Sequence, residues 1–288
     1  MFEGFDRRRI ATGDAELAVV TAGAGPPVLL VHGYPQNHVM WHKVAPALAE
    51  RFTVVAPDLR GYGDSSAPPA GERSVAYSKR VMATDLVALM DALGHERFAV
   101  VGHDRGARVS YRLALDHPDR VTRLTVLDII PTLEQFESTS GTAGRFLWHW
   151  FFLAQPAPLP EHMILADREF FLTSMLRAWS GSPEAIGDEA LAAYLDAFDE
   201  HTVRATCDDY RAGATIDCEL DAADREAGRR ITCPVLALWG DRGASRDLLV
   251  VWRRWADDVD GRGLPCGHFI AEEAPAELLR ELVPFLEG

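Results

Sequence analysis

The feature that most constrains the fold of this chain is an alternation between short apolar runs and longer helical patterns. The apolar runs are rich in β-branched residues, and they end at Gly, Asp or His. They cover residues 16–23, 28–31, 52–58, 98–102, 124–128 and 235–241. Such an alternation is typical of a parallel sheet covered by helices, and the carboxyl ends of its strands would hold a site. We therefore predict an α/β fold with a mostly parallel sheet.

A break in this alternation predicts an inserted region. From about residue 131 to 225 the chain is aromatic, rich in proline and mostly helical, and the strand pattern resumes at Pro234. We interpret residues 131–225 as a helical cap inserted into a core of residues 1–130 and 226–288. Residues 16–23 would open the sheet as part of a hairpin.

Composition and charge narrow the class of protein. Of the 288 residues, 48% are hydrophobic, which suits a large buried core, and 29 basic against 43 acidic residues give a net charge of −14. Nucleic-acid binding relies on a basic surface, so a nucleic-acid partner is not expected. No apolar run approaches the ~20 residues of a membrane helix, and the first ten residues lack the apolar stretch of a signal peptide. Four scattered cysteines without a Cys-x-x-Cys pair argue against a disulfide framework or a zinc site and predict a cytoplasmic protein.

The segment VGHDRGARVSY, residues 101–111, has the outline of a nucleophile turn with an acid where esterases carry serine. Gly102 and Gly106 flank Asp104 at the junction of an apolar strand and a helix that Pro118 must end. The same aspartate would also suit the N-cap of that helix, so the pattern is weak by itself. It gains weight only from residues elsewhere in the chain.

Two further segments complete a catalytic arrangement. VHGYP, residues 31–35, follows a central strand, where the backbone N–H of Tyr34 would be a donor of an oxyanion hole. His268 comes after the last strand, so the order along the chain is nucleophile, acid, histidine. Asp128 and Asp241 each end a strand, and either would orient the imidazole by accepting its ring N–H. The residues alone do not decide which of these two aspartates orients His268.

An aspartate at the nucleophile position points to a particular chemistry. A serine that attacks a saturated carbon would form an ether, which water does not readily cleave. An aspartate would form an ester, whose carbonyl carbon activated water can attack. Asp104 therefore predicts displacement at an sp3 carbon of an alkyl halide or an epoxide, followed by hydrolysis in which His268 is the base.

Two arginines follow the aspartate closely. Arg105 is adjacent to Asp104, and Arg108 lies one helical turn later, near the positive end of the helix dipole. For a single arginine, an ion pair with Asp104 or with a surface acid is the simpler interpretation. Two guanidinium forks beside one nucleophile are instead suited to a carboxylate, and the negative charge of the whole protein is screened at longer range. We therefore predict a small anionic substrate.

Together these motifs resemble the haloacetate and fluoroacetate dehalogenases of the α/β-hydrolase fold. The resemblance covers nearly the whole chain and is carried by HGYPQNHVMW, DLRGYGDSS, GHDRGARVSYRLALDHPDRV, LDIIPT, WHWFFLAQPAPLPE, DYRAGATIDCELD and GHF. HDRG is the discriminating element, because haloalkane dehalogenases and epoxide hydrolases usually carry Trp after the nucleophile. In the dehalogenase family the orienting acid follows the LDIIP strand, so the resemblance favours Asp128 over Asp241.

The resemblance implies hydrolysis of a 2-haloacid, such as fluoroacetate or chloroacetate, to the hydroxy acid and halide. Arg105 and Arg108 would bind the substrate carboxylate, and water would be the co-substrate. The other implied site residues are three halide ligands, His149, Trp150 and Tyr210, and one aromatic residue that lines the site, Trp179. The resemblance also implies a homodimer that needs neither a metal nor an organic cofactor.

Two other functions are compatible with these residues. An epoxide hydrolase shares Asp104 and His268 but usually presents two cap tyrosines to the epoxide oxygen, for which this chain offers mainly Tyr194 and Tyr210. A non-catalytic ligand receptor of the same fold is the second alternative, and the complete Asp–His–Asp set disfavours it. We therefore predict a haloacetate dehalogenase.

Overall fold

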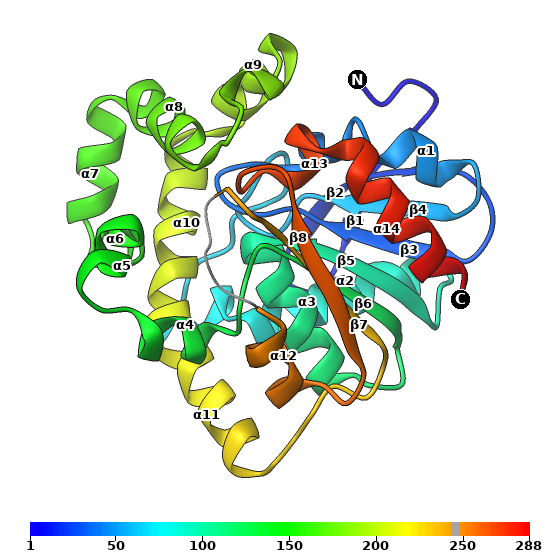
Figure 1. Ribbon diagram of the computed structural model, residues 1–288. Helices are drawn as coiled ribbons and strands as arrows, with labels where there is room; N and C mark the ends of the chain where they lie inside the picture. The colour runs from blue at the N-terminus through cyan, green and yellow to red at the C-terminus, as the bar shows by residue number, and fades with distance from the viewer. Residues whose placement is uncertain (243–247) are drawn as a thin grey trace.

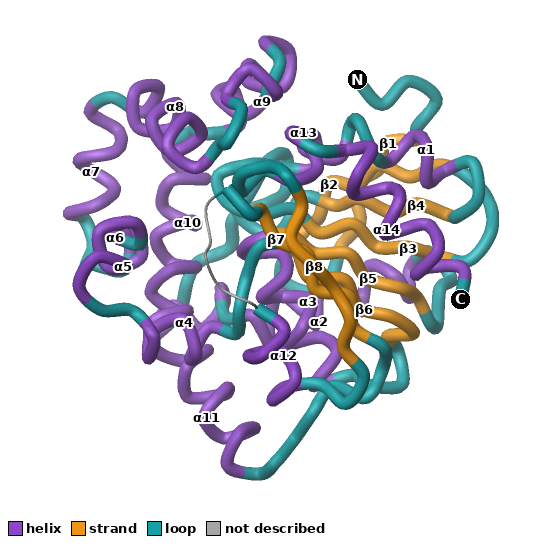
Figure 2. Tube along the Cα trace, in the orientation of Figure 1, coloured by secondary structure: helices purple, strands orange, loops and turns teal. Residues whose placement is uncertain are grey.

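The computed structural model describes residues 1–242 and 248–288, which include an eight-stranded sheet (Figures 1 and 2). Its strands are β1 (Asp6–Ala11), β2 (Glu16–Ala22), β3 (Pro27–Val31), β4 (Thr53–Pro57), β5 (Phe98–His103), β6 (Val121–Leu127), β7 (Val235–Gly240) and β8 (Val259–Leu264). Their order is β1-β2-β4-β3-β5-β6-β7-β8. β1 and β2 form an antiparallel hairpin, β2 is also antiparallel to β4, and the other neighbours are parallel. The predicted α/β fold and its mostly parallel sheet are confirmed.

The two edge strands, β1 and β8, are those that the apolar runs do not predict. β1 is exposed along most of its length and contains three consecutive arginines, and β8 has only one fully buried residue. The central strand β5 is instead buried at every position, because helices cover both faces of the parallel part of the sheet. An apolar run thus marks a buried strand, whereas an edge strand can be polar.

Helices cover both faces of the sheet. They are α1 (Ala45–Ala49), α2 (Lys79–Ala92), α3 (Asp104–Asp116), α12 (Leu249–Trp255), α13 (Ile270–Glu273) and α14 (Pro275–Glu287), with the short 3-10 helices η1 (His38–Trp41) and η2 (Glu72–Tyr77). α1 packs against α14 on one face, and α2 packs against α3 on the other (Figure 1). α12 joins the second group, since the rings of Tyr111 in α3 and Trp252 in α12 are 5.9 Å apart.

The chain between β6 and β7 has only helical elements. They are α4 (Thr132–Ser138), α5 (Gly141–Phe146), α6 (Trp148–Leu153), α7 (Leu159–Ala166), α8 (Arg168–Trp179), η3 (Pro183–Ala185), α9 (Asp188–Ala197), α10 (Glu200–Ala212), the π-helical turn η4 (Gly213–Asp217) and α11 (Cys218–Glu226). These helices gather beside the sheet, in green to yellow in Figure 1. We propose that residues 131–225 are a cap on a core made of residues 1–130 and 226–288.

α3 is buried along nearly its whole length although it carries several charges. It lies between the sheet and the inserted helices, and the side chains of Tyr111 and Arg112 contact α11. Arg112 binds Asp221 and Asp224, and the hydroxyl of Tyr111 donates to Asp221 at 2.8 Å. These contacts fix the helix whose first residue, Asp104, follows the carboxyl end of β5.

The described residues also show whether a helix could cross a membrane and what state the cysteines are in. None of their helices has the length and apolar character needed to cross a membrane. The four cysteines are free thiols. Burial raises the pKa of Cys218 and of Cys266 to about 12, so these thiols stay protonated and are not activated as nucleophiles.

Candidate active site

Asp104 lies at a sharp turn between β5 and α3. Its φ is +46°, a left-handed conformation that costs a non-glycine residue roughly 1–3 kcal/mol. Two glycines make room for this turn: a Cβ at Gly106 would lie 2.1 Å from the carbonyl oxygen of His32, and one at Gly33 would lie 2.5 Å from Cβ of Asp104. Oδ1 of Asp104 accepts a hydrogen bond of 3.0 Å from the N–H of Tyr34. The structure thus brings the candidate nucleophile to the backbone donor that the sequence predicts.

His268 lies between two carboxylates. Its Nδ1 is 2.5 Å from Oδ2 of Asp128, and because a carboxylate only accepts, Nδ1 is the donor. The other nitrogen, Nε2, therefore carries the lone pair of the neutral ring and lies 3.9 Å from Oδ2 of Asp104, too far for a hydrogen bond. Asp241 instead bonds through its backbone N–H to Leu264. Of the two aspartates left open by the sequence, Asp128 is the one that contacts the imidazole.

Neighbouring charges shift the pKa values of the nucleophile and the histidine. Burial lowers the pKa of His268, but the hydrogen bond and charge of Asp128 outweigh it and leave this pKa above its usual value. Burial raises the pKa of Asp104, whereas His268, His103 and the two arginines lower it, and the net pKa lies below its usual value. Asp104 is therefore ionised near neutral pH, as a nucleophile requires.

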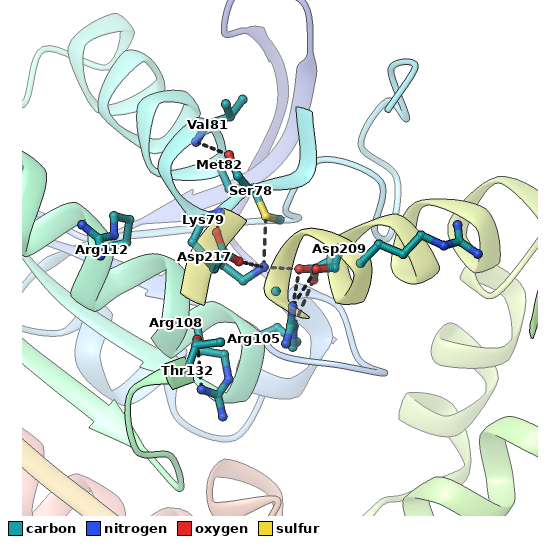
Figure 3. A network of polar contacts seen from close by, with 12 residues as sticks. Ser78, Lys79, Val81, Met82, Arg105, Arg108, Arg112, Thr132, Asp209 and Asp217 are labelled. Carbon is teal, nitrogen blue, oxygen red and sulfur yellow. Dashed lines mark hydrogen bonds and ion pairs between the residues drawn. The ribbon is translucent and has the colours of Figure 1, made fainter. Parts of the chain in front are cut away.

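Four ionic residues form the charged side of the site: Lys79 of α2, Arg105 and Arg108 of α3, and Asp209 of α10 (Figure 3). None of them is more than 2% exposed. Nε and Nη2 of Arg105 donate to the carboxylate of Asp209 at 3.2 and 2.6 Å, and Lys79 binds the same carboxylate. Burial raises the pKa of Asp209, but the charges of Arg105 and Lys79 outweigh it and hold the pKa well below its usual range. One carboxylate thus joins two cations from different helices.

Contacts within the protein occupy part of each of the two guanidinium groups. Asp209 occupies Nε and Nη2 of Arg105, and only Nη1 of that guanidinium is without a hydrogen-bond partner. Nη1 of Arg108 donates to the carbonyl oxygen of Ile130 at 2.9 Å and to Oγ1 of Thr132 at 3.3 Å, while its Nε has no partner. Burial and the charge of Arg105 lower the pKa of Arg108. Within the part of the chain that the structure describes, no carboxylate forms an ion pair with Arg108.

Four rings form the aromatic side of the site: Tyr34, His149, Trp179 and Tyr210. The centroid distances are 4.5 Å from His149 to Trp179, 5.9 Å from His149 to Tyr210, and 5.4 Å from Tyr34 to Tyr210. Trp179 also lies 5.7 Å from the imidazole of His268. The hydroxyls of Tyr34 and Tyr210 are buried without a hydrogen-bond partner. The aromatic side therefore offers two buried O–H groups that have no hydrogen-bond partner.

The groups of the aromatic side are uncharged at neutral pH. Burial lowers the pKa of His149 to about 3, so its ring is neutral and keeps one N–H. Burial and the charge of Asp104 raise the pKa of Tyr210 well above its usual range, so its hydroxyl stays protonated. Trp150 lies between the two sides, since its ring is 4.4 Å from the guanidinium carbon of Arg108 and 6.1 Å from the ring of Tyr210. Trp150 thus contacts one residue of the charged side and one residue of the aromatic side.

Sequence reasoning missed two members of the charged side, Lys79 and Asp209, and the free hydroxyl of Tyr34. A signal for Asp209 existed, because an acid inside a buried helix requires a cation nearby. Its partners are 104 and 130 residues away in the chain, so the sequence did not indicate which cation it would meet. Residues 1–242 and 248–288 contain no group of three or more His, Cys, Asp or Glu side chains arranged to hold a metal ion.

Comparisons with known proteins show the family to which the chain belongs. The model of the alpha/beta hydrolase fold matches residues 26–275. The chain belongs to the α/β-hydrolase family. A fluoroacetate dehalogenase from Burkholderia sp is 46% identical to this α/β-hydrolase over 99% of the present chain and 95% of its own. A soluble epoxide hydrolase from Corynebacterium sp. (strain C12) is 36% identical over 92% of each chain. A solved structure described as an alpha/beta hydrolase from Nostoc sp PCC 7120 has a TM-score of 0.97 and 51% identity over 99% of each chain.

These relatives support a hydrolase activity for this α/β-hydrolase. They differ in substrate class, because one is named for fluoroacetate and another for epoxides. The choice between these classes must therefore come from the residues of the site.

Proposed function

We propose that this α/β-hydrolase hydrolyses a short 2-haloacid, fluoroacetate or chloroacetate, to glycolate and halide. The observation that carries the proposal is the charge of Arg108, which is buried, interacts with the charge of Asp104 without an ion pair to any carboxylate of the described residues, and has an unused Nε. Burying a charge without a partner costs several kcal/mol, so such a group fits a site whose ligand supplies the negative charge. A carboxylate about 4 Å away would interact by roughly 4 kcal/mol at an effective dielectric of 20. The 46% identity to a fluoroacetate dehalogenase supports the same substrate class.

In the first step, Oδ2 of Asp104 would attack the carbon that bears the halogen. Oδ1 already accepts the N–H of Tyr34, which leaves Oδ2 as the less engaged oxygen. A carbon–oxygen bond forms as the carbon–halogen bond breaks, and the halide leaves with the bonding electron pair. Nη1 of Arg105 and the guanidinium of Arg108 would hold the substrate carboxylate and so orient the carbon for attack. The product is a carboxymethyl ester of Asp104.

In the second step, water would attack Cγ of this ester and give a proton to Nε2 of His268, whose other nitrogen is held by Asp128. Negative charge develops on Oδ1, where the N–H of Tyr34 stabilises it. The Cγ–Oδ2 bond then breaks, and glycolate leaves with Oδ2 after taking the proton from His268. Asp104 regains two oxygens, one of them from water, and loses its remaining proton to solvent.

The departing halide would be bound by neutral donors. Tyr210 supplies an O–H without another partner, His149 supplies one ring N–H, and we assign the indole N–H of Trp150 to the same group. Fluoride concentrates its charge on a small atom and depends most on such donors. The aromatic side therefore supports fluoroacetate as well as chloroacetate as a substrate.

The geometry favours a haloacid over an epoxide. Of the two cap tyrosines that an epoxide hydrolase would use, Tyr194 is engaged elsewhere: its hydroxyl donates to Glu272 at 2.6 Å and accepts from Gln36 at 3.0 Å. Only Tyr210 of this pair keeps an unused hydroxyl. An epoxide also brings no carboxylate to Arg108.

The test is to trap the ester. His268→Asn removes the base, so chloroacetate should leave a covalent adduct that intact-protein mass spectrometry detects and that digestion maps to Asp104. Wild-type enzyme should release halide from fluoroacetate and chloroacetate and should not open a panel of epoxides. Asp128→Asn should lose most turnover, and Asp241→Asn is its matched control. An adduct on another residue, or epoxide opening without halide release, would refute the proposal.

We also infer that the protein is a cytoplasmic homodimer, as its resemblance to the dehalogenases implies. Large apolar side chains are exposed on the inserted helices: Phe146 at 74%, Phe170 at 68% and Met163 at 58%. Apolar surface of this kind marks an interaction site, and a second copy would cover it. The free cysteines support a reducing compartment. Light scattering should give the dimer mass for the wild type, and Phe170→Asp should lower it; a monomeric wild type would contradict the inference.

A further inference from the structure

Glu273 is a half-buried carboxylate that accepts four backbone hydrogen bonds. Its Oε2 accepts from the N–H groups of Gly181 at 2.8 Å, Ser182 at 2.9 Å and Gly267 at 3.0 Å, and its Oε1 accepts from Phe269 at 3.1 Å. Two of these donors flank His268 in the chain, and the other two follow α8 in the inserted helical region. A carboxylate is the acceptor-only side chain that can serve several N–H groups at once.

The four bonds join two segments that touch through glycine. We call residues 267–269 the histidine loop and residues 179–182 the cap loop. A Cβ on Gly267 would lie 2.1 Å from the nitrogen of Gly181, and a Cβ on Gly181 would lie 2.8 Å from the nitrogen of Gly267. The two backbones therefore approach more closely than any side chain would allow, and Glu273 binds the N–H groups on both sides of the contact.

The backbone N–H and the carbonyl oxygen of His268 are both hydrogen-bonded. Its N–H donates to the carbonyl oxygen of Trp179 in the cap loop at 3.0 Å, and its carbonyl oxygen accepts from Nε2 of His103 at 2.8 Å. Every N–H of the histidine loop is thus bound either by Glu273 or by the cap loop. These bonds hold the backbone of His268, and Asp128 holds its imidazole through Nδ1.

We propose that Glu273 is a positioning residue for His268 that makes the base of the second step dependent on the seated cap loop. The inference rests on the proposed two-step function. Displacement needs Asp104, the arginines and the halide donors, none of which Glu273 contacts. Hydrolysis of the ester needs Nε2 of His268 aimed at a water beside Cγ, and a small misplacement of a base is costly in rate. Glu273 therefore acts on ester hydrolysis and leaves displacement largely unchanged.

The test separates the two steps in Glu273→Gln. The amide keeps the size of the side chain but replaces one acceptor oxygen with an NH₂ group, which cannot accept from the loop N–H groups. With chloroacetate in rapid-quench experiments, the variant should release halide in a burst of one equivalent per site. The ester on Asp104 should then decay at least about tenfold more slowly than in wild type, short of the roughly 10²–10⁴ that loss of a base costs.

Glu272→Gln is the matched control. Glu272 is adjacent and also links the inserted region to the core, through the hydroxyl of Tyr194 and through Lys43, but its carboxylate accepts nothing from the histidine loop. A general loosening of the cap would give both variants the same defect. Only Glu273→Gln should accumulate the ester, and Glu273→Asp, which keeps the carboxylate, should recover part of the hydrolysis rate.

A second variant covers the case in which Glu273→Gln fails to fold. Gly181→Ala keeps the Glu273 side chain, but its Cβ would lie 2.8 Å from the nitrogen of Gly267 and 3.1 Å from Oε2 of Glu273, so it should separate the two loops and show the same burst and slow decay. Equal slowing of both steps in either folded variant, or ester accumulation in Glu272→Gln as well, would overturn the inference. If His268→Asn itself traps no adduct on Asp104, the proposed function fails and the inference falls with it; an adduct there, with no slow step in Glu273→Gln, refutes the inference alone.

Discussion

The charged side of the site presents full charges, and the aromatic side presents neutral donors. On the charged side, Asp209 is shared between Arg105 and Lys79, and Arg108 remains without a carboxylate among the described residues. On the aromatic side, His149 is kept neutral by burial, and the hydroxyls of Tyr34 and Tyr210 are buried without partners. Both sides meet at Asp104 and His268.

The difference matches the two negative charges of the proposed reaction. The carboxylate of a haloacid is charged from binding to product release, so a permanent cation suits it and contributes equally to the ground state and the transition state. The charge of the halide develops only as the carbon–halogen bond breaks. Neutral donors bind that developing charge better than the uncharged halogen, and this is the condition for a faster chemical step. The charged side should therefore govern KM, and the aromatic side should govern kcat.

The largest expected effect concerns the stability of the charged side. Asp209→Asn leaves Arg105 and Lys79 buried without their shared carboxylate, and breaking a buried ion pair from one side costs about 3–5 kcal/mol. Tyr34→Phe on the aromatic side removes a hydroxyl that has no partner and should change the free energy of unfolding by less than about 1 kcal/mol. Chemical denaturation of the two variants measures both values. Similar losses of unfolding free energy in the two variants would contradict the proposed difference between the charged side and the aromatic side.

The second effect concerns kcat. Tyr210→Phe deletes one preorganised donor and leaves the ring packing intact. The activation free energy for fluoroacetate should therefore rise by about 3 kcal/mol, and kcat should fall roughly a hundredfold. Chloride leaves more readily, and chloroacetate turnover should fall less. Steady-state kinetics on both substrates give the ratio. Equal losses would assign Tyr210 to substrate placement, and no loss would exclude it from the reaction.

The third effect concerns KM. Arg108→Lys keeps the charge but loses the planar fork and the unused Nε. The loss of about 1.5 kcal/mol of binding free energy should lower kcat/KM for chloroacetate roughly tenfold, mainly by raising KM. Arg80→Lys is the control, because Arg80 forms a partly exposed pair with Asp116 far from the reaction. A loss confined to kcat would mean that Arg108 acts on the chemical step, as we expect of the aromatic side, and would contradict the assignment of KM to the charged side.

The residues of the site also differ in how far the sequence predicts them. Local motifs identify Asp104, the N–H of Tyr34 and both arginines, because the strand-to-helix turn and its glycines have a fixed spacing. Asp209 and Glu273 escape notice because their roles depend on contacts between distant segments and, for Glu273, on backbone N–H groups that leave no trace in residue type. β1 and β8 are missed for a related reason, since edge strands need no apolar run. The nucleophile can be identified from the sequence, whereas the partners of the buried charges can be identified only from the folded structure.

The smallest expected effect concerns pH. Displacement needs Asp104 in its ionised form, and because the pKa of Asp104 is below its usual value, the displacement rate should not change across the neutral range. Ester hydrolysis needs neutral His268, so it should accelerate as the pH rises through the pKa of that residue, which the hydrogen bond and charge of Asp128 raise against the effect of burial. The aromatic side should add nothing, because the pKa of His149, about 3, leaves it neutral throughout. In single-turnover measurements of ester decay, His149→Gln should therefore leave the midpoint of the pH profile where it is in wild type. A midpoint that moves with His149→Gln would mean that His149 takes up a proton during the reaction, and the aromatic side would then bind halide as a cation in the same way as the charged side binds carboxylate.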